Sequence, residues 1–296
     1  MKGFAKSYKL MLILVQITNN FDLLERKVDF MVDWKKIDDF AKSWIKEAGE
    51  EIKKSFKNTL NIETKSNRND LVTNIDKQTE QFFIKKIKEI FPDHKILGEE
   101  GFGDRIEKLT GITWIIDPID GTMNFIHQQR NFAISIGIYE DGIGKIGLIY
   151  DVVLDELYHA FKGEGAYLND IRLPALKETK VSEAIVALNA SWVIQNKKID
   201  PAILTRLALD VRGTRSYGSA AIELAGVASG RIDAYISLRL APWDFAAGLV
   251  LIEEVGGVAS TLHREPLNLL KQNTVFVAKP GLHQVIMKNY LNNGKW

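Results

Sequence analysis

The sequence predicts a mixed α and β fold in two halves, an antiparallel sheet packed on two helices followed by an α/β half. Three observations support this. Two amphipathic helical patterns come first, a series of short apolar runs separated by Gly or Asp turns follows, and strands then alternate with helices. The pattern of the sequence changes at the segment "LPALKETK" (173–180), so we predict halves at 31–178 and 179–296.

The first predicted helix lies within "VDWKKIDDFAKSWIKEAGEEIKKSF" (32–56), where apolar residues recur every three or four positions. The polar stretch 58–70 has little to bury and is expected to be a mobile loop. A second helix is predicted from Gln78 to Phe91, closed by Pro92. The strands of the first sheet are then predicted at 95–100, 112–117, 132–140, 145–153 and 156–169.

The second half alternates strands and helices without an internal repeat. Strands are predicted in "AIVALN", "IDAYISL" and "TVFVAKP". Helical segments are predicted near Pro201 to Leu209 and from about Gly281 to Leu291, and "WDFAAGLVLIEEVGG" places Asp244 at the mouth of another helix. This alternation is typical of an α/β half.

Composition excludes several classes of protein. The 296 residues carry 39 Lys plus Arg against 38 Asp plus Glu, a net charge of +1, which argues against a nucleic-acid partner. The absence of cysteine excludes disulfides and thiolate chemistry and fits a reducing, cytoplasmic location. Five scattered histidines without an HExxH motif argue against zinc. The N-terminal run "KLMLILV" is too short to span a bilayer, so no stable membrane association is expected. Residues 1–30 are interpreted as an accessory extension or an upstream start-site artefact.

The stretch "WIIDPIDGTMNF" (114–125) carries the strongest chemical signal. The residue before a proline favours extended geometry, which places Asp117 at the carboxyl end of a buried strand, where ligand sites of α/β folds gather. Pro118 is expected to turn the chain so that Asp120 faces the same side, Gly121 permits close approach of the backbone, and Thr122 can begin a helix. Two adjacent carboxylates repel unless a cation lies between them, and hard oxygen ligands indicate Mg²⁺.

Two further stretches could complete this site. "LGEE" places Glu99 at the end of a strand-like run, and "APWDFAAG" places Asp244 near a helix start. Alone, an acid at a helix N-terminus is commonly a cap, and a Glu-Glu pair is commonly solvated surface. Their coincidence with the Asp-x-x-Asp stretch favours one common site.

These motifs together resemble the inositol monophosphatase family of Mg²⁺-dependent, lithium-sensitive phosphatases. The matching segments are "GEE" (98–100), "DPIDGT" (117–122) and "WDFAAG" (243–248), with "LVTNID" (71–76) and "RSYGSAA" (215–221) in the same order. The resemblance spans about residues 31–296. It implies a layered αβαβα sugar-phosphatase-like fold, usually found as a homodimer, and a small phosphorylated substrate.

The resemblance also implies residue roles. Two or three Mg²⁺ ions per site would be held by Glu99, Asp117, Asp120, Asp244 and the backbone carbonyl of Ile119. Thr122 and Glu99 would orient the attacking water, and Asp76 would act around the metal and water. The main-chain amides of Gly121 and Thr122 would grip the phosphate. The implied substrate contacts are Asp120, Gly121, Thr122, Ser219, Ala220, Ser237 and Asp244.

Substrate choice is the weakest part of the resemblance. At the aligned position where inositol-specific relatives have a glutamate this chain has Ser237, which predicts a broad phosphatase that acts on inositol 1-phosphate and other small monoesters. Arg239 could contact a second phosphate or remain solvated. The alternatives are a phosphatase of the same superfamily that acts on NADP(H), 3′-phosphoadenosine 5′-phosphate or fructose 1,6-bisphosphate, and an inactive metal-binding regulatory relative.

Overall fold

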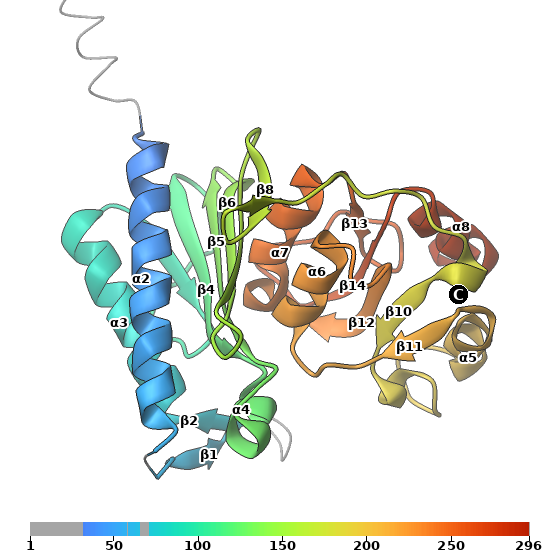
Figure 1. The fold of residues 1–296 in the computed structure, drawn as a ribbon, viewed down its shortest axis with the longest axis horizontal. Helices are drawn as coiled ribbons and strands as arrows, with labels where there is room; N and C mark the ends of the chain where they lie inside the picture. The colour runs from blue at the N-terminus through green and yellow to red at the C-terminus, as the bar shows by residue number, and fades with distance from the viewer. Residues whose placement is uncertain (1–31, 58, 66–70, 296) are drawn as a thin grey trace, which may run out of the picture. The chain divides into compact units, whose positions relative to one another are not determined.

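The computed structural model describes residues 32–57, 59–65 and 71–295, and Figure 1 shows its fold. The chain divides into two compact units, Met1–Phe40 and Ala41–Trp296. Of the first unit, residues 32–40 are described, and they contain the first turns of helix α2 (Trp34–Ser55). The predicted extension, residues 1–30, lies outside the described residues.

Helices α2 and α3 (Asn74–Ile90) were both predicted, but α3 begins one turn earlier than Gln78. Thr73 caps it, because its hydroxyl accepts from the N–H groups of Ile75 and Asp76 while the Asp76 carboxylate accepts from the Thr73 N–H. This capping box satisfies N–H groups that would otherwise lack partners, and it fixes Asp76 in the first turn.

The first sheet has seven strands in the order β3-β4-β5-β6-β7-β8-β9. Their bounds are β3 Lys95–Gly98, β4 Ile112–Asp120, β5 Ala133–Glu140, β6 Ile143–Asp151, β7 Glu156–Phe161, β8 Gly165–Leu168 and β9 Ile171–Arg172. All neighbours are antiparallel except β3 and β4, which run parallel, so the prediction of a wholly antiparallel sheet was wrong at this edge. The connection 99–111 is long enough for a crossover rather than a hairpin.

The second sheet has five strands in the order β11-β10-β12-β14-β13. Their bounds are β10 Ile185–Leu188, β11 Gly213–Arg215, β12 Ala234–Leu240, β13 Val258–Ser260 and β14 Asn273–Ala278. Strand β10 is parallel to β11 and β12, whereas β14 is antiparallel to β12 and β13. The predicted α/β half is therefore present, although β11 and β13 were not predicted as strands.

The helices form layers around the two sheets within the second unit (Figure 1). Helices α6 (Ala220–Ala228) and α7 (Pro242–Glu254) lie between the sheets, since α7 contacts β5 and β6 and α6 contacts β12 and β14. Gly147 allows the close approach of α7, because a Cβ at this position would overlap the carbonyl oxygen of Ala247. Helices α5 (Pro201–Asp210) and α8 (Leu282–Asn289) contact the second sheet at β11 and β14. The predicted alternation of helical and sheet layers is confirmed.

The remaining elements are short. Strands β1 (Ile62–Thr64) and β2 (Leu71–Thr73) form an antiparallel pair inside and beside the predicted loop, and residues 66–70 of that loop lie outside the described residues. The other short elements are α4 Thr122–Gln128, η1 Val181–Glu183, η2 Ala190–Trp192 and η3 Asn292–Gly294. In the part of the chain that the structure describes, no helix has both the length and the apolar character that a membrane crossing requires.

Candidate active site

The candidate site is built on an irregular end of strand β4. Its pairing with β5 shifts register between Asp117 and Asp120, and the strand continues to Asp120 instead of turning at Pro118 as predicted. Asp117 Oδ1 accepts from the Ile119 N–H at 3.0 Å. Gly121 follows with φ of 96°, a left-handed conformation, and a Cβ there would lie 3.1 Å from the Cβ of Ser219. The glycine therefore lets β4 turn into α4 against the start of α6.

Three aspartates meet at this point. One carboxylate oxygen from each of Asp117, Asp120 and Asp244 lies within 4.8 Å of the others. Asp117 and Asp120 are 1% and 8% exposed, so water screens their repulsion poorly. Asp117 and Asp120 lie on β4, whereas Asp244 lies on α7, more than a hundred residues later, so the fold brings them together.

Burial and mutual repulsion raise the pKa of each aspartate. Burial, followed by the charges of Glu99, Asp120 and Asp244, raises the pKa of Asp117 well above its ordinary value. Burial raises the pKa of Asp120 to about 7, against the hydrogen bonds from Ser219 and Ala221 that lower it. Burial and the charges of Asp120 and Glu99 raise the pKa of Asp244. Such a set of oxygens suits a hard divalent cation such as Mg²⁺.

Helix starts hold two of the aspartates in place. Asp120 Oδ2 accepts from the Ser219 hydroxyl and, at 2.6 Å, from the Ala221 N–H at the start of α6. Asp244 Oδ2 accepts from the Ala241 N–H at 2.8 Å at the start of α7. Asp244 is thus a helix-terminal acid, as the simpler interpretation had it, and also a member of the carboxylate group.

Glu99 lies beside this group and is paired with a lysine. Its Oε1 accepts from Lys65 Nζ at 2.9 Å, and Glu100 Oε1 accepts from the same ammonium at 2.6 Å. The charge of Glu99 nevertheless contributes to the raised pKa of Asp117 and Asp120. Glu99 is therefore close enough to share the same electrostatic environment, although Lys65 balances part of its charge.

Thr122 forms a hydrogen bond with Asp76. Its Oγ1 lies 3.1 Å from Asp76 Oδ1 and 3.1 Å from the carbonyl oxygen of Ile119, so its single proton can be donated to either. Asp76 Oδ2 accepts from the N–H and the hydroxyl of Thr73. Burial raises the pKa of Asp76 to about 6. Because this pKa is still below pH 7.5, the carboxyl is mostly ionised at that pH and accepts hydrogen bonds.

A polar cavity of about 250 Å³ opens beside the aspartates. The residues from the sequence prediction that line it are Asp120, Ser219, Ala220, Ser237 and Asp244, together with Gly218 and Arg239. Gly121 and Thr122 do not line it, and they lie at the start of α4. The cavity thus joins the carboxylate group to the residues expected to contact substrate.

Several residues of this cavity escaped the sequence prediction, among them Glu223, Asn189 and Trp192. Glu223 is 4% exposed; its Oε1 accepts from the N–H groups of Tyr217 and Gly218 at 2.7 and 3.3 Å, while its buried Oε2 has no partner. An acid inside the small, apolar helix "AAIELAG" was the signal that could have identified it. Asn189 and Trp192 come from a segment without periodic pattern, so no comparable signal existed.

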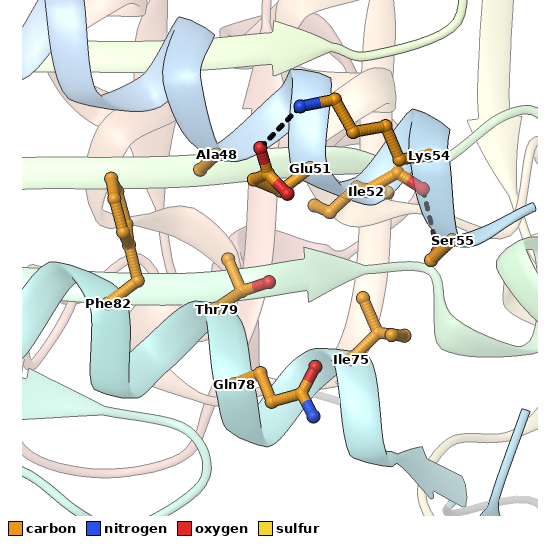
Figure 2. A pocket seen from close by; sticks show the side chains of 9 residues that line it. All are labelled: Ala48, Glu51, Ile52, Lys54, Ser55, Ile75, Gln78, Thr79 and Phe82. Atoms are coloured by element: carbon orange, nitrogen blue, oxygen red, sulfur yellow. Dashed lines mark hydrogen bonds and ion pairs between the residues drawn. The ribbon is translucent and has the colours of Figure 1, made fainter.

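Another cavity, of about 300 Å³, lies between α2 and α3 (Figure 2). It is lined by apolar side chains such as Ile52, Ile75 and Phe82, and Figure 2 shows the ion pair of Glu51 with Lys54, at 2.7 Å, beside them. None of the predicted site residues lines it. Its chemistry is that of a helix-packing cleft, so we place the active site at the carboxylate group.

The fold and the site together define a class: a layered α/β protein with a buried carboxylate centre suited to divalent cations, as in metal-dependent phosphatases. Comparison with known proteins makes the assignment specific. The model of the "Inositol monophosphatase family" matches residues 33–294. The chain is 62% identical over 265 residues to the inositol-1-monophosphatase of Bacillus subtilis (strain 168), covering 90% of this chain and 100% of that protein.

Solved structures agree. A crystal structure of SaIMPase-II with bound 2′AMP is 46% identical, with a TM-score of 0.80, and the match covers 87% of this chain and 95% of that one. An IMPase/NADP phosphatase complexed with Mg²⁺ and phosphate is 29% identical, with a TM-score of 0.79, over 86% and 94% of the two chains. The chain therefore belongs to the inositol monophosphatase family and is a phosphoric monoester hydrolase.

Proposed function

We propose that this chain hydrolyses inositol 1-phosphate and other small phosphate monoesters, with Mg²⁺ as its cofactor and water as the nucleophile. The observation that carries the proposal is the approach of Asp117, Asp120 and Asp244 to within 4.8 Å beside a polar cavity. The similarity to an inositol-1-monophosphatase along its whole length supports the choice of substrate.

The proposed metal ligands are Glu99, Asp117, Asp120, Asp244 and the backbone carbonyl of Ile119, for two or three ions. The donor set fits, because these are oxygen ligands and the pKa values of the three aspartates are raised in the absence of a compensating cation. When bound, Mg²⁺ supplies positive charge against the phosphate oxygens and favours ionisation of the attacking water.

The chain's own residues would orient the reactants. Asp76 accepts the Thr122 proton, which leaves the lone pairs of Thr122 Oγ1 available to the water. Glu99 would accept a proton from the same water on its other side. The main-chain amides of Gly121 and Thr122 would bind the phosphate at the start of α4, and Ser219 and Ala220 would contact the substrate at the start of α6. Such positioning accounts for most of phosphoryl-transfer catalysis.

Substrate selectivity is proposed to be broad. Ser237 is 5% exposed and lines the cavity, but its side chain is shorter than glutamate and uncharged. It cannot polarise a sugar hydroxyl as a carboxylate would, so discrimination in favour of inositol is expected to be weak. We also propose that the enzyme is a cytoplasmic homodimer, in line with the cysteine-free sequence and the family resemblance.

The test is phosphate release by the purified full-length chain with and without Mg²⁺, on inositol 1-phosphate, glycerol 2-phosphate, NADP, 3′-phosphoadenosine 5′-phosphate and fructose 1,6-bisphosphate. Mg²⁺-dependent release from inositol 1-phosphate is the expected result. Exclusive action on one of the last three would assign one of the alternative phosphatases. No release from any of the substrates would favour an inactive metal-binding relative.

A further inference from the structure

Three side chains on one face of β12 line the substrate cavity. Tyr235, Ser237 and Arg239 alternate along the strand, so they project to the same side. The pairing of β12 with β14 shifts register between Ser237 and Leu240, and the Arg239 N–H lies 3.5 Å from Ser237 Oγ. Leu240 pairs with Asn273 beyond the shift, so the irregularity is confined to residues 238–239 at the cavity wall.

Arg239 is an unusual member of this wall. Its side chain is exposed, and within the described residues its guanidinium has neither an ion pair nor a hydrogen bond. It is also the one basic residue among the described residues that line the cavity, whose other charged members are Asp120, Glu223 and Asp244. With Asp120 and Asp244 proposed to hold Mg²⁺, Arg239 is the cavity side chain that can bind a negative charge beyond the reacting phosphate.

Trp192 forms another part of the wall. It ends the 3₁₀ helix η2, which is fixed by Asn189 because Asn189 Oδ1 accepts from the N–H and hydroxyl of Ser191 at 2.9 and 2.7 Å. The indole is half-buried and packs against the apolar cluster around Phe276. A flat aromatic surface that is already ordered loses little entropy when a second ring stacks on it.

We propose that Trp192 and Arg239 form a distal subsite that selects nucleotide monoesters with a second phosphate. The base of the leaving group would stack on Trp192, and the second phosphate would bind Arg239. Ser237, two residues before Arg239 on β12, lines the same cavity, and its short side chain leaves space for the sugar. This inference rests on the proposed function; it chooses between the two interpretations of Arg239 left open by the sequence and adds Trp192, which the sequence did not indicate.

Three substrates separate the two contacts. NADP carries a base and additional phosphates, adenosine 2′-phosphate carries a base alone, and glycerol 2-phosphate carries neither. We expect Arg239→Ala to lower kcat/KM for NADP at least tenfold more than for the other two, mainly through KM. Trp192→Ala is expected to lower kcat/KM for both nucleotides about tenfold to a hundredfold more than for glycerol 2-phosphate. Trp192→Phe should retain most of the nucleotide preference.

Arg212→Ala is the matched control, since Arg212 is exposed in the same half of the chain but does not line the cavity. It should alter none of the three rates. Equal losses on all substrates, or no change in the ratio of NADP to glycerol 2-phosphate, would overturn the subsite.

Failure of the proposed function is recognised separately, as absence of Mg²⁺-dependent phosphate release from every substrate by the wild-type chain. In that event, calorimetric binding of NADP to the wild-type chain and to Arg239→Ala decides the question. Weaker binding by the variant would support the subsite, and equal affinity would refute it.

Discussion

Asp120→Asn should separate two effects of the Asp120 carboxylate: its effect on the stability of the metal-free protein and its contribution to turnover. In the structure Asp120 Oδ2 accepts from the Ser219 hydroxyl and the Ala221 N–H, and an asparagine carbonyl oxygen can accept from both. The fold should therefore be retained. The variant removes one charge from a group of three carboxylates, which weakens metal binding, and we expect its turnover to fall about a hundredfold to a thousandfold.

The same substitution should stabilise the metal-free protein at high pH. Burial raises the pKa of Asp120 from 3.8 to about 7, so the folded chain holds this proton more tightly than the unfolded chain. The contribution of this proton to the free energy of unfolding is fully present below about pH 4 and is lost as the pH rises through about 7. The difference corresponds to an upper limit of roughly 4 kcal/mol at pH 8 for the wild-type chain. The asparagine side chain does not titrate in this pH range, so the variant should lack this part of the pH dependence of stability.

Thermal unfolding between pH 5 and pH 8, in EDTA and in Mg²⁺, measures both effects. Wild-type protein in EDTA should become less stable over this interval, and Mg²⁺ should restore its stability because the ion binds the folded state. Asp120→Asn should be the more stable of the two in EDTA at pH 8 and should respond less to Mg²⁺. If the variant kept more than about a tenth of wild-type turnover at saturating Mg²⁺, or were less stable than wild type in EDTA at pH 8, the role given to Asp120 would be wrong.

The other predictions concern inhibition, the N-terminus, selectivity and the cavity wall. Li⁺ should inhibit by occupying a Mg²⁺ position, and phosphate release unchanged in tens of millimolar Li⁺, roughly the dose for a weakly held competitor, would contradict this. A chain that begins at Met31 should fold and hydrolyse phosphate esters like the full chain, because the family match begins at residue 33; loss of solubility or of activity would contradict the prediction. Because of Ser237, kcat/KM for inositol 1-phosphate should exceed that for glycerol 2-phosphate and NADP by less than about a thousandfold, some 4 kcal/mol, and a larger ratio would mean that another residue reads inositol. Glu223→Ala should lower the free energy of unfolding by about 1–3 kcal/mol because two amides lose their acceptor, whereas Glu223→Gln should cost less; equal losses in denaturant titrations would argue against that role.

Local sequence signals anticipated much of the fold. The amphipathic pattern of α2 and the apolar runs of the first sheet follow from spacing alone, because one face of each element is buried. The start of α3 was missed although Thr73 and Asp76 have the spacing of a capping box. The parallel pairing of β3 with β4 was missed because strand direction depends on the path of residues 99–111, which have no regular pattern.

The candidate site was anticipated where its residues share a motif. Asp117 and Asp120 are close in sequence, and the "APWDFAAG" segment added Asp244, which the structure places beside them. The contribution of Trp192 to the cavity depends on how distant segments pack, which no local pattern encodes, whereas Glu223 had a local signal as an acid within a small, apolar helix. The catalytic roles of Glu99 and the other site residues stay predictions until variants are measured.

The pairing of the β4 aspartates with helix starts from the other half has a consequence for biosynthesis. A ribosome-bound chain exposes Asp117 and Asp120 long before Ala221 and Asp244 have been synthesised. Until then Asp120 lacks the Ala221 N–H that orients it, and the pair lacks the third carboxylate, so we expect a nascent chain to hold the ion more weakly than the finished protein. We therefore expect metal loading to follow the synthesis of helices α6 and α7, and truncated translation products to remain metal-free.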